Sequence, residues 1–456
     1  MEQALLEHYR AQREANLEGL FELLRIPSIS ALPAHRDDVR RAAEFLAADL
    51  TKMGMDSVRL IEGDGHPIVY ADWLHAPGKP TLVLYGHYDV QPPDPLDEWL
   101  SPPFEPTVRN DNVYARGAVD DKGQTYLILK AVEGLMAVQG KLPVNVKFLI
   151  EGEEETDGGV LRDWLTANGS ELGADAALIC DTEMFAPGLP TITTGLRGMV
   201  YAEIEVRGSR TDLHSGMYGG VAPNAFQGLV EILSGLKAPD GRVLIPGFYD
   251  DVEAPSAAEL EAWAKLPYDE DAVRVNEIGS KTLTGEPGYT PMERMWARPT
   301  FEIHGMPGGF IGEGAKTVIP AKATAKISTR LVPNMDPDKI ADALKTAVQA
   351  LEPKGMTATT RILGKAPASL SSTDSIYVRK AAEAMEQSFG RRTVYQRSGG
   401  SIPVVGLMQE QAGVPSVMMG FGLPDDNLHA PNEKFHLPNF YAGIETVGRY
   451  LTLLGE

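Results

Sequence analysis

The feature of this sequence that most constrains its fold is the alternation of short apolar runs with segments of helical periodicity between Thr81 and Cys180. The runs Thr81–Tyr85, Val144–Ile150 and Ala176–Cys180 have the length and residue types of buried strands, and Gln124–Val138 and Leu161–Ala167 have the apolar spacing of helices. Buried strands that alternate with helices are typical of a domain built on a mainly parallel sheet. The sequence therefore predicts the α/β fold class for this region.

The pattern changes at Met199. Five segments then predict a strand, a helix, a strand, a helix and a strand, in this order: Met199–Val206, Pro223–Leu236, Ala323–Val332, a helix opened by Asp336-Pro337, and Met356–Leu363. A chain of 456 residues is too long for one core. We therefore expect a smaller, ferredoxin-like α+β domain at residues 199–364, inserted into a discontinuous α/β domain of residues 1–198 and 365–456. Two helical stretches, the second at about Asp37–Met53, open the chain.

Charge and cysteine content limit the partners and the compartment. Lys and Arg number 42 against 63 Asp and Glu, which gives a net charge of -21. Nucleic acid and anionic membranes are disfavoured as partners because both carry phosphate. No run approaches the roughly 18 apolar residues that a membrane helix needs. The single cysteine, Cys180, excludes a disulfide within the chain, so we expect a soluble cytoplasmic protein.

Potential metal ligands lie directly after the predicted strands or in a loop before a predicted helix. In an open α/β sheet, the crevice at the carboxyl ends of the strands is where ligands bind, so side chains from these places converge. The candidates are His87, the pair Asp120-Asp121, the acidic run Glu151–Glu155, and Asp181.

Each candidate also has a structural alternative. His87 and Asp89 point to the same side of an extended chain, so Asp89 can orient a ligating His87, but such a pair is also common on protein surfaces. The acidic run is equally explained as a solvated loop. Asp120 or Asp121 can serve as the N-cap of the helix that follows.

The arrangement of motifs resembles the M20 family of metallopeptidases, in the branch of the cytosolic nonspecific and carnosine dipeptidases. Eight motifs occur in the family's order along essentially the whole chain. They are Gly86–Pro92, Ala115–Gly123, Glu151–Glu155, Asp212–Gly216, Thr317–Pro320, Arg330–Pro333, Gly399–Pro403 and His429–Lys434.

The resemblance implies a centre of two divalent metal ions. His87, Asp120 and Asp181 would bind one ion, Asp120, Glu155 and His429 the other, and Asp120 would bridge them. Three carboxylates then supply three negative charges against the four positive charges of two dications. Nitrogen and oxygen ligands without thiolate suit Zn²⁺ or Mn²⁺.

The resemblance also implies catalytic roles for two acids. Glu154 matches the general base, which takes a proton from the attacking water and passes it to the leaving amine. Asp89 matches the residue that orients His87. The family further places a cis peptide bond after the bridging aspartate, here between Asp120 and Asp121.

His214 resembles the histidine that reaches into the active site of a neighbouring subunit and polarises the scissile carbonyl. The resemblance thus implies a homodimer formed through the inserted domain. Thr317, Arg330, Ser401 and His429 match substrate-binding positions, where Arg330 would pair with the terminal carboxylate of a dipeptide. A structural salt bridge is the alternative role for Arg330.

The sequence departs from the family pattern at two places. The acidic motif continues as Thr156-Asp157-Gly158, where relatives usually have a glycine and then a serine at the last two positions, and Glu153 adds a further carboxylate. Glu183 lies close enough in sequence to replace Asp181 as a ligand. In the family an aspartate at the Asp181 position goes with dipeptidases and aminopeptidases, and a glutamate with carboxypeptidases and deacylases.

We therefore predict a metal-dependent dipeptidase. An N-acyl-amino-acid deacylase that uses the same site is the alternative enzyme, and a catalytically inactive relative that acts as a binding protein is the alternative from another class.

Overall fold

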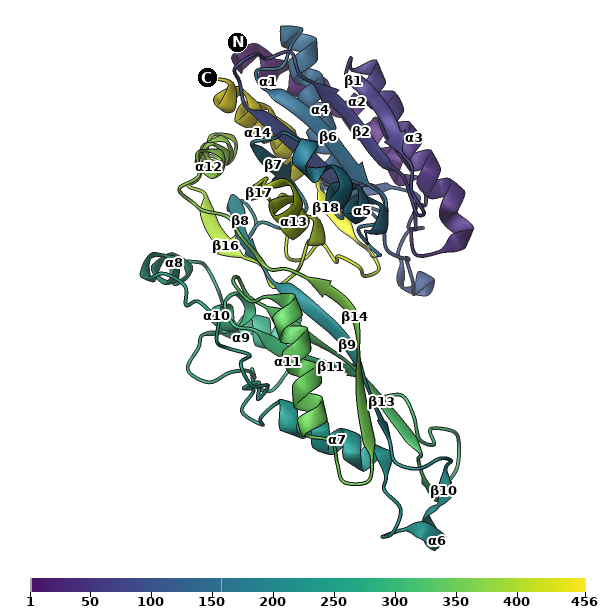
Figure 1. The fold of residues 1–456 in the computed structure, drawn as a ribbon. Helices are drawn as coiled ribbons and strands as arrows, with labels where there is room; N and C mark the ends of the chain where they lie inside the picture. The colour runs from purple at the N-terminus through teal and green to yellow at the C-terminus, as the bar shows by residue number, and fades with distance from the viewer. Residues whose placement is uncertain (1, 157) are drawn as a thin grey trace. The chain divides into compact units, whose positions relative to one another are not determined.

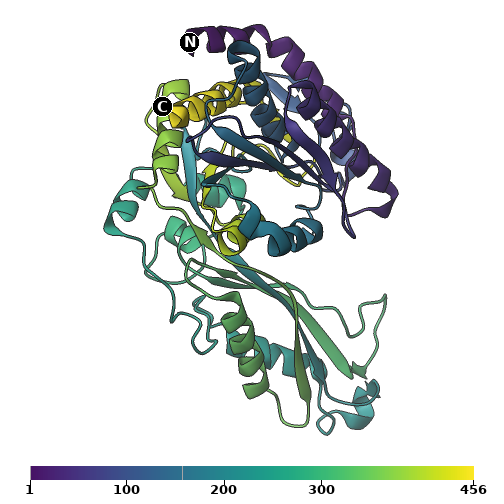
Figure 2. The same ribbon diagram turned by 45° about the horizontal axis from the view of Figure 1, so that its top comes forward.

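The computed structural model describes residues 2–156 and 158–456. Asp157, one of the positions at which the acidic motif differs from the family pattern, lies outside the described residues. The chain divides into two compact units (Figures 1 and 2). Unit 1 comprises residues 1–194, 371–396 and 402–456, and unit 2 comprises residues 195–370 and 397–401. No helix in the described residues is long and apolar enough to cross a membrane.

Unit 1 is built on a mixed sheet of nine strands, of which the last in the order, residues 369–370, falls within the bounds of unit 2. Their order is β1-β2-β6-β3-β7-β17-β8-β15, with β16 beside β8. The strands are β1 (Asp56–Ile61), β2 (Ile68–Trp73), β3 (Thr81–His87), β6 (Asn145–Glu151), β7 (Ala176–Ile179), β8 (Thr191–Leu196), β15 (Ser369–Leu370), β16 (Val394–Arg397) and β17 (Ser416–Met419). The four central strands β6, β3, β7 and β17 are parallel. The predicted α/β fold class is therefore confirmed.

Helices complete unit 1. They are α1 (Glu2–Ala11), α2 (Arg13–Leu24), α3 (Arg36–Lys52), α4 (Lys122–Gln139), α5 (Gly159–Asn168), α12 (Ile376–Phe389), α13 (Pro403–Leu407) and α14 (Leu437–Gly455). Leu82 and Leu84 of β3 join the core that includes α4 and α14, while Val83 and Tyr85 point the other way and are equally buried. Burial on both faces explains why the central strands are continuous apolar runs in the sequence.

Unit 2 contains a four-stranded antiparallel sheet with the order β11-β13-β9-β14. Its strands are β9 (Gly198–Arg207), β11 (Thr300–Gly305), β13 (Lys322–Leu331) and β14 (Thr357–Ala366), and α7 (Ala225–Leu236) and α11 (Pro337–Ala350) pack against it. The succession β9-α7-β11-β13-α11-β14 is that of a ferredoxin-like fold, as predicted. Asp336 caps α11, as expected, since its Oδ1 accepts a hydrogen bond from the backbone N–H of Asp338 at 2.8 Å.

The sequence did not predict β11, which is the edge strand of this sheet. The long stretch before it also contains short helices, namely α8 (Ala257–Trp263), α9 (Glu270–Ala272) and α10 (Pro291–Trp296). Small elements flank both main sheets: β10 (Leu213–His214) pairs with β12 (Val318–Ile319) beside α6 (Ser215–Tyr218), and β4 (Thr107–Arg109), β5 (Asn112–Tyr114) and β18 (Lys434–His436) form a three-stranded sheet.

Candidate metal centre

Three neighbouring parallel strands of unit 1 end at the same edge of the sheet. His87 is the last residue of β3 and lies beside Glu151, the last residue of β6. Asp181 follows the end of β7, the other neighbour of β3. Gly86 lets the chain of α4 approach this edge, because a side chain at Gly86 would collide with Thr125. The sequence-predicted candidates therefore come together where the carboxyl ends of the strands meet.

The loop before α4 brings two further carboxylates to this edge. The Asp120–Asp121 peptide bond is cis, as the family resemblance implied. Asp121 occupies the N-cap position of α4, and its Oδ2 accepts hydrogen bonds from His87 N at 3.2 Å and Thr125 Oγ1 at 2.8 Å. Asp121 thus ties β3 to α4, which leaves Asp120 as the acid of the pair that faces the histidines.

Two groups of potential ligands share Asp120. The first contains His87, Asp120 and Asp181, and the second contains Asp120, Glu155 and His429; within each group one ligand atom per residue lies within 4.8 Å of the others. His87 Nε2 is 3.2 Å from Asp120 Oδ1 and 3.9 Å from Asp181 Oδ2. His429 Nε2 is 2.9 Å from Asp120 Oδ2 and 3.3 Å from Glu155 Oε2. Within the described chain, Glu183 belongs to neither group.

The His87 ring fits a metal site. It is fully buried, and its Nδ1 lies 3.1 Å from the backbone oxygen of Asp89 and 3.4 Å from the Oδ1 of the same residue. Donation from Nδ1 leaves the lone pair on Nε2, and this buried atom has no hydrogen-bond partner among the described residues. A buried nitrogen with a free lone pair amid carboxylates is the donor that a divalent cation requires.

The electrostatics of the cluster also fit a cation. Burial and neighbouring carboxylates raise the pKa of Glu154 and of Asp181 well above the ordinary values. Burial alone would also raise the pKa of Asp120, but the neighbouring imidazoles of His429 and His87 lower it below its ordinary value. Buried carboxylates that repel one another are stabilised by a bound dication.

Asp89 has contacts that the sequence analysis missed. Its Oδ1 accepts a hydrogen bond from Glu154 N at 3.2 Å, and its Oδ2 accepts from Glu155 N at 3.1 Å and from Ser30 Oγ at 2.6 Å. The same side chain therefore holds the His87 ring and the acidic loop. Glu153 faces elsewhere and accepts from the backbone N–H groups of His66 and Val160.

The four candidate residues of unit 2 form two pairs. His214 ends β10 and is exposed, its Nδ1 accepts from Gly216 N at 2.9 Å, and the neighbouring Ser215 N donates to Thr317 O at 3.1 Å. In the second pair, Arg330 Nη1 donates to Ser401 Oγ at 2.8 Å. Burial lowers the pKa of Arg330, and in the described part of the chain Arg330 forms no ion pair. The structural salt bridge considered for Arg330 is therefore not found there.

Arg197 is a neighbour of this second pair that the sequence analysis did not single out. Ser401 Oγ donates to the Arg197 backbone oxygen at 2.5 Å, and Arg197 Nε donates to Gly399 O at 2.9 Å. Burial and the charge of Arg330 lower the pKa of Arg197 to about 10. Its position directly after an apolar strand was the available signal.

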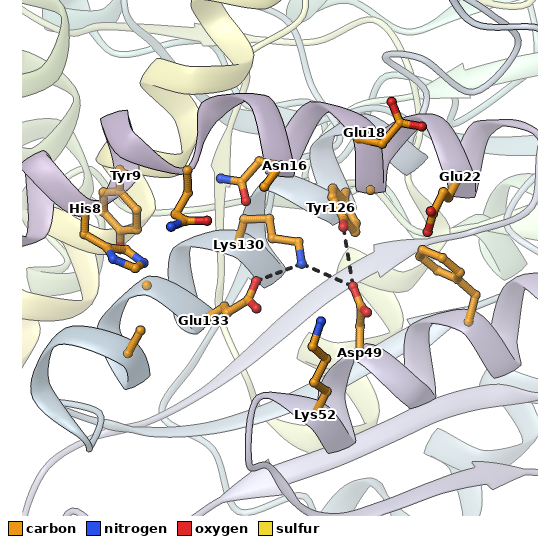
Figure 3. A pocket seen from close by; sticks show the side chains of 16 residues that line it. His8, Tyr9, Asn16, Glu18, Glu22, Asp49, Lys52, Tyr126, Lys130 and Glu133 are labelled. Carbon is orange, nitrogen blue, oxygen red and sulfur yellow. Dashed lines mark hydrogen bonds and ion pairs between the residues drawn. The ribbon is translucent and has the colours of Figure 1, made fainter.

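A separate polar cavity of about 500 Å³ lies in unit 1 among α1, α2, α3 and α4 (Figure 3). Lys130 crosses it and binds Asp49 Oδ2 at 3.2 Å and Glu133 Oε2 at 2.8 Å. None of the residues that line it belongs to the two ligand groups. We interpret this cavity as a junction between helices whose central charge is already paired.

Comparison with known proteins agrees with this geometry. The model of peptidase family M20/M25/M40 matches residues 83–453. The Cys-Gly metallodipeptidase of Schizosaccharomyces pombe is 33% identical over 98% of this chain and 97% of its own length. The crystal structure of human carnosine dipeptidase 1 has a TM-score of 0.85 and 27% identity, and covers 100% of this chain and 98% of that one. The structure of an M20 family metallo-carboxypeptidase from Sulfolobus solfataricus has a TM-score of 0.86 and 34% identity over 96% of this chain and 99% of that one.

Proposed function

Because the chain belongs to peptidase family M20/M25/M40, we propose that this peptide-bond hydrolase is a metallodipeptidase that cleaves unsubstituted dipeptides at a centre of two divalent cations. The observation that carries the proposal is the pair of ligand groups that share Asp120 at the carboxyl end of β3. The similarity to Cys-Gly and carnosine dipeptidases along nearly the whole chain supports the substrate class.

His87, Asp120 and Asp181 would hold one cation and Asp120, Glu155 and His429 the other. When bound, two dications lower the pKa of a water molecule and stabilise negative charge on the carbonyl oxygen. The ligand set has nitrogen and oxygen donors without thiolate, so Zn²⁺ and Mn²⁺ are the ions proposed. Asp89 keeps the Nδ1 proton of His87 in place, which presents Nε2 to the cation.

Glu154 is the proposed general base. Its backbone N–H is held by Asp89, and its side chain is largely buried among the ligand carboxylates. A carboxylate in this position accepts the proton of the attacking water and then donates it to the nitrogen of the leaving amine. The burial that raises the pKa of Glu154 brings it closer to the pH at which such a group both accepts and donates a proton.

Arg330 is the proposed anchor for the substrate carboxylate. Its guanidinium has a hydroxyl partner, Ser401, and a second guanidinium, Arg197, nearby, but no carboxylate partner in the described chain. A planar guanidinium binds a carboxylate through two parallel hydrogen bonds. An amino acid with a free carboxyl terminus therefore fits this group, and Thr317 and His429 are proposed to contact the rest of the substrate.

A homodimer through unit 2 is proposed from the surroundings of His214. Large apolar side chains are exposed near it in sequence and in the loop before β12: Met217, Tyr218, Val221, Phe310 and Ile311. Val221 and Ile311 are 85% and 91% exposed, which is unfavourable unless another surface covers them. We propose that a second copy covers this surface and that His214 reaches the partner's metal centre, where it would polarise the scissile carbonyl.

The similarity to a metallo-carboxypeptidase at 34% identity supports a second candidate function, the release of carboxyl-terminal residues from longer or N-blocked peptides. A deacylase of N-acyl amino acids would use the same groups.

A substrate panel tests these functions. Free dipeptides, tripeptides, and N-acetyl and N-succinyl amino acids are offered to the protein with Zn²⁺ or Mn²⁺ and after chelation. We expect metal-dependent turnover of the dipeptides. Turnover of only the blocked or longer compounds would establish the second candidate or the deacylase instead. A protein that binds no dication and hydrolyses none of the panel would be the inactive binding relative.

A further inference from the structure

Glu433 is a fully buried carboxylate, and the hydrogen-bond donors of its side chain in the described part of the chain belong to one turn of unit 1. Its Oε2 accepts hydrogen bonds from Arg116 Nη1 at 2.8 Å and Gly117 N at 2.9 Å. Its Oε1 accepts from Val119 N at 3.0 Å and Asp120 N at 3.1 Å. Four donors thus converge on one carboxyl group, and the last of them belongs to the acid shared by both ligand groups.

Glu433 belongs to the same loop as His429. This loop is closed on itself: Lys434 Nζ binds Asp426 Oδ1 at 2.6 Å, Lys434 N donates to Asp426 O at 3.0 Å, and Asn427 donates to Asn432 O. His429 has φ +59°, a left-handed conformation that few residues other than glycine adopt, so the loop must hold it there. The loop therefore acts as a preformed unit that carries His429.

Contacts of Glu433 connect this unit to the turn that carries Asp120. The carboxylate accepts hydrogen bonds from the turn of residues 116–120. The backbone oxygen of Glu433 accepts a further hydrogen bond from Ala115 N at 3.2 Å. Asp120 Oδ2 and His429 Nε2 are 2.9 Å apart. Asp120 belongs to the turn that Glu433 contacts, and His429 belongs to the loop that contains Glu433. A shift of either loop would change the separation of two ligands in the second group.

We propose that Glu433 is a positioning residue that sets the spacing of Asp120 and His429 and thereby the affinity for the cation held by Asp120, Glu155 and His429. This inference rests on the proposed function, because it assumes that the two ligand groups bind dications. Groups that support metal ligands typically change metal affinity by about 10- to 100-fold when they are replaced.

The chain supplies a matched control. Asp426 is also a fully buried carboxylate of this loop, but its partners are Lys434 and Leu423 N, not the turn 116–120. Asp426→Asn therefore weakens the loop without loosening its link to Asp120. Glu433→Gln keeps the size of the side chain and turns an NH₂ group toward backbone donors.

The experiment titrates the apo forms of the full chain with Zn²⁺ in competition with a chromophoric chelator. His429→Ala identifies the binding step that belongs to the second ligand group. We expect Glu433→Gln to weaken that same step by about 10- to 100-fold and to leave the other step unchanged. We expect Asp426→Asn to lower the melting temperature and to weaken the second step much less than Glu433→Gln does, because its link to the turn 116–120 is kept. Dipeptide turnover by Glu433→Gln should recover with excess Zn²⁺, which a damaged fold would not do.

Two results would overturn the proposal. One is that Glu433→Gln binds Zn²⁺ with wild-type affinity at both steps, and the other is that Asp426→Asn loses as much Zn²⁺ affinity at the second step as Glu433→Gln does. If Glu433→Gln does not fold, Glu433→Asp carries the test, because it keeps the charge beside Arg116 and withdraws the oxygens by one methylene. A wild-type chain that binds two Zn²⁺ ions but hydrolyses no peptide would refute the proposed function, while the difference between the variants would still decide the role of Glu433.

Discussion

The candidate groups of the two units are held in different ways. In unit 1, His87, Asp89 and Glu433 are fully buried, and each is fixed by hydrogen bonds within the unit. In unit 2, His214 is exposed at the end of a two-residue strand, and the side chain of Arg330 donates to Ser401 and has no carboxylate partner among the described residues. The difference teaches that the ligand groups of unit 1 are preorganised by the protein itself, whereas unit 2 presents groups for which we propose a substrate or a second copy as the partner.

The largest effect on kcat is expected from a change in unit 1. Glu154→Gln removes the proposed base and should lower kcat by about 10²- to 10⁴-fold, while both dications stay bound. Steady-state kinetics and metal analysis of the same sample measure both quantities. Glu153→Gln is the matched control in the same acidic run, since its carboxylate accepts hydrogen bonds from the backbone N–H groups of His66 and Val160 and belongs to neither ligand group. Normal turnover in Glu154→Gln would show that another group is the base.

The next effect tests whether an exposed group of unit 2 belongs to a shared site. His214→Ala should lower kcat by about 10²- to 10³-fold, as expected for the loss of a group that stabilises an oxyanion. Because His214 is proposed to act in the partner's site, a mixture of His214→Ala and Glu154→Gln chains should regain activity that neither has alone. A mixture that stays inactive after subunit exchange, or a fully active monomer, would remove the role across the interface.

A smaller effect is expected at the substrate carboxylate. Arg330→Met should raise KM for free dipeptides by about 10- to 100-fold, because a hydrogen-bonded charge pair is lost, and should leave KM for carboxy-amidated dipeptides unchanged. Arg361→Met is the control, since Arg361 is an arginine of unit 2 whose partner is the surface residue Glu203. Equal changes for free and amidated substrates would contradict the carboxylate contact.

The smallest effect on catalysis is expected in the helical layer of unit 1. Lys130→Met removes the charge that crosses the cavity of Figure 3 and should lower the free energy of unfolding by about 1–3 kcal/mol, because Asp49 and Glu133 lose their partner. Denaturant unfolding measures this loss, and kcat and KM should stay at wild-type values. A changed kcat would mean that this cavity communicates with the metal centre.

The fold was predictable where local patterns are strong and not where they are weak. The central strands β3, β6 and β7 are buried on both faces, so they appear as apolar runs. The edge strand β11, Thr-Phe-Glu-Ile-His-Gly, buries only Phe301 and was missed. Its membership in the sheet comes from pairing with β13, which no local pattern records.

The same distinction holds for the candidate site. His87, Asp120 and Asp181 could be singled out because each follows a strand or precedes a helix. Glu433 stood inside a recognised motif but had no assigned role, and Arg197 was not noticed, because their partners are distant in sequence: 313 residues separate Glu433 from Asp120, and 202 separate Arg197 from Gly399.

By itself, the sequence determined the α/β class, the kinds of ligand available, and the family, since periodicity and motifs are properties of neighbouring residues. The family resemblance already implied that Asp120 is shared and that Asp89 orients His87. Only the tertiary structure decided that Asp89 also contacts the acidic loop and that Glu433 joins the loops of Asp120 and His429. The physical reason is that hydrogen-bond and ligand geometry depend on how distant segments pack, and packing is set by the whole core and not by any one segment.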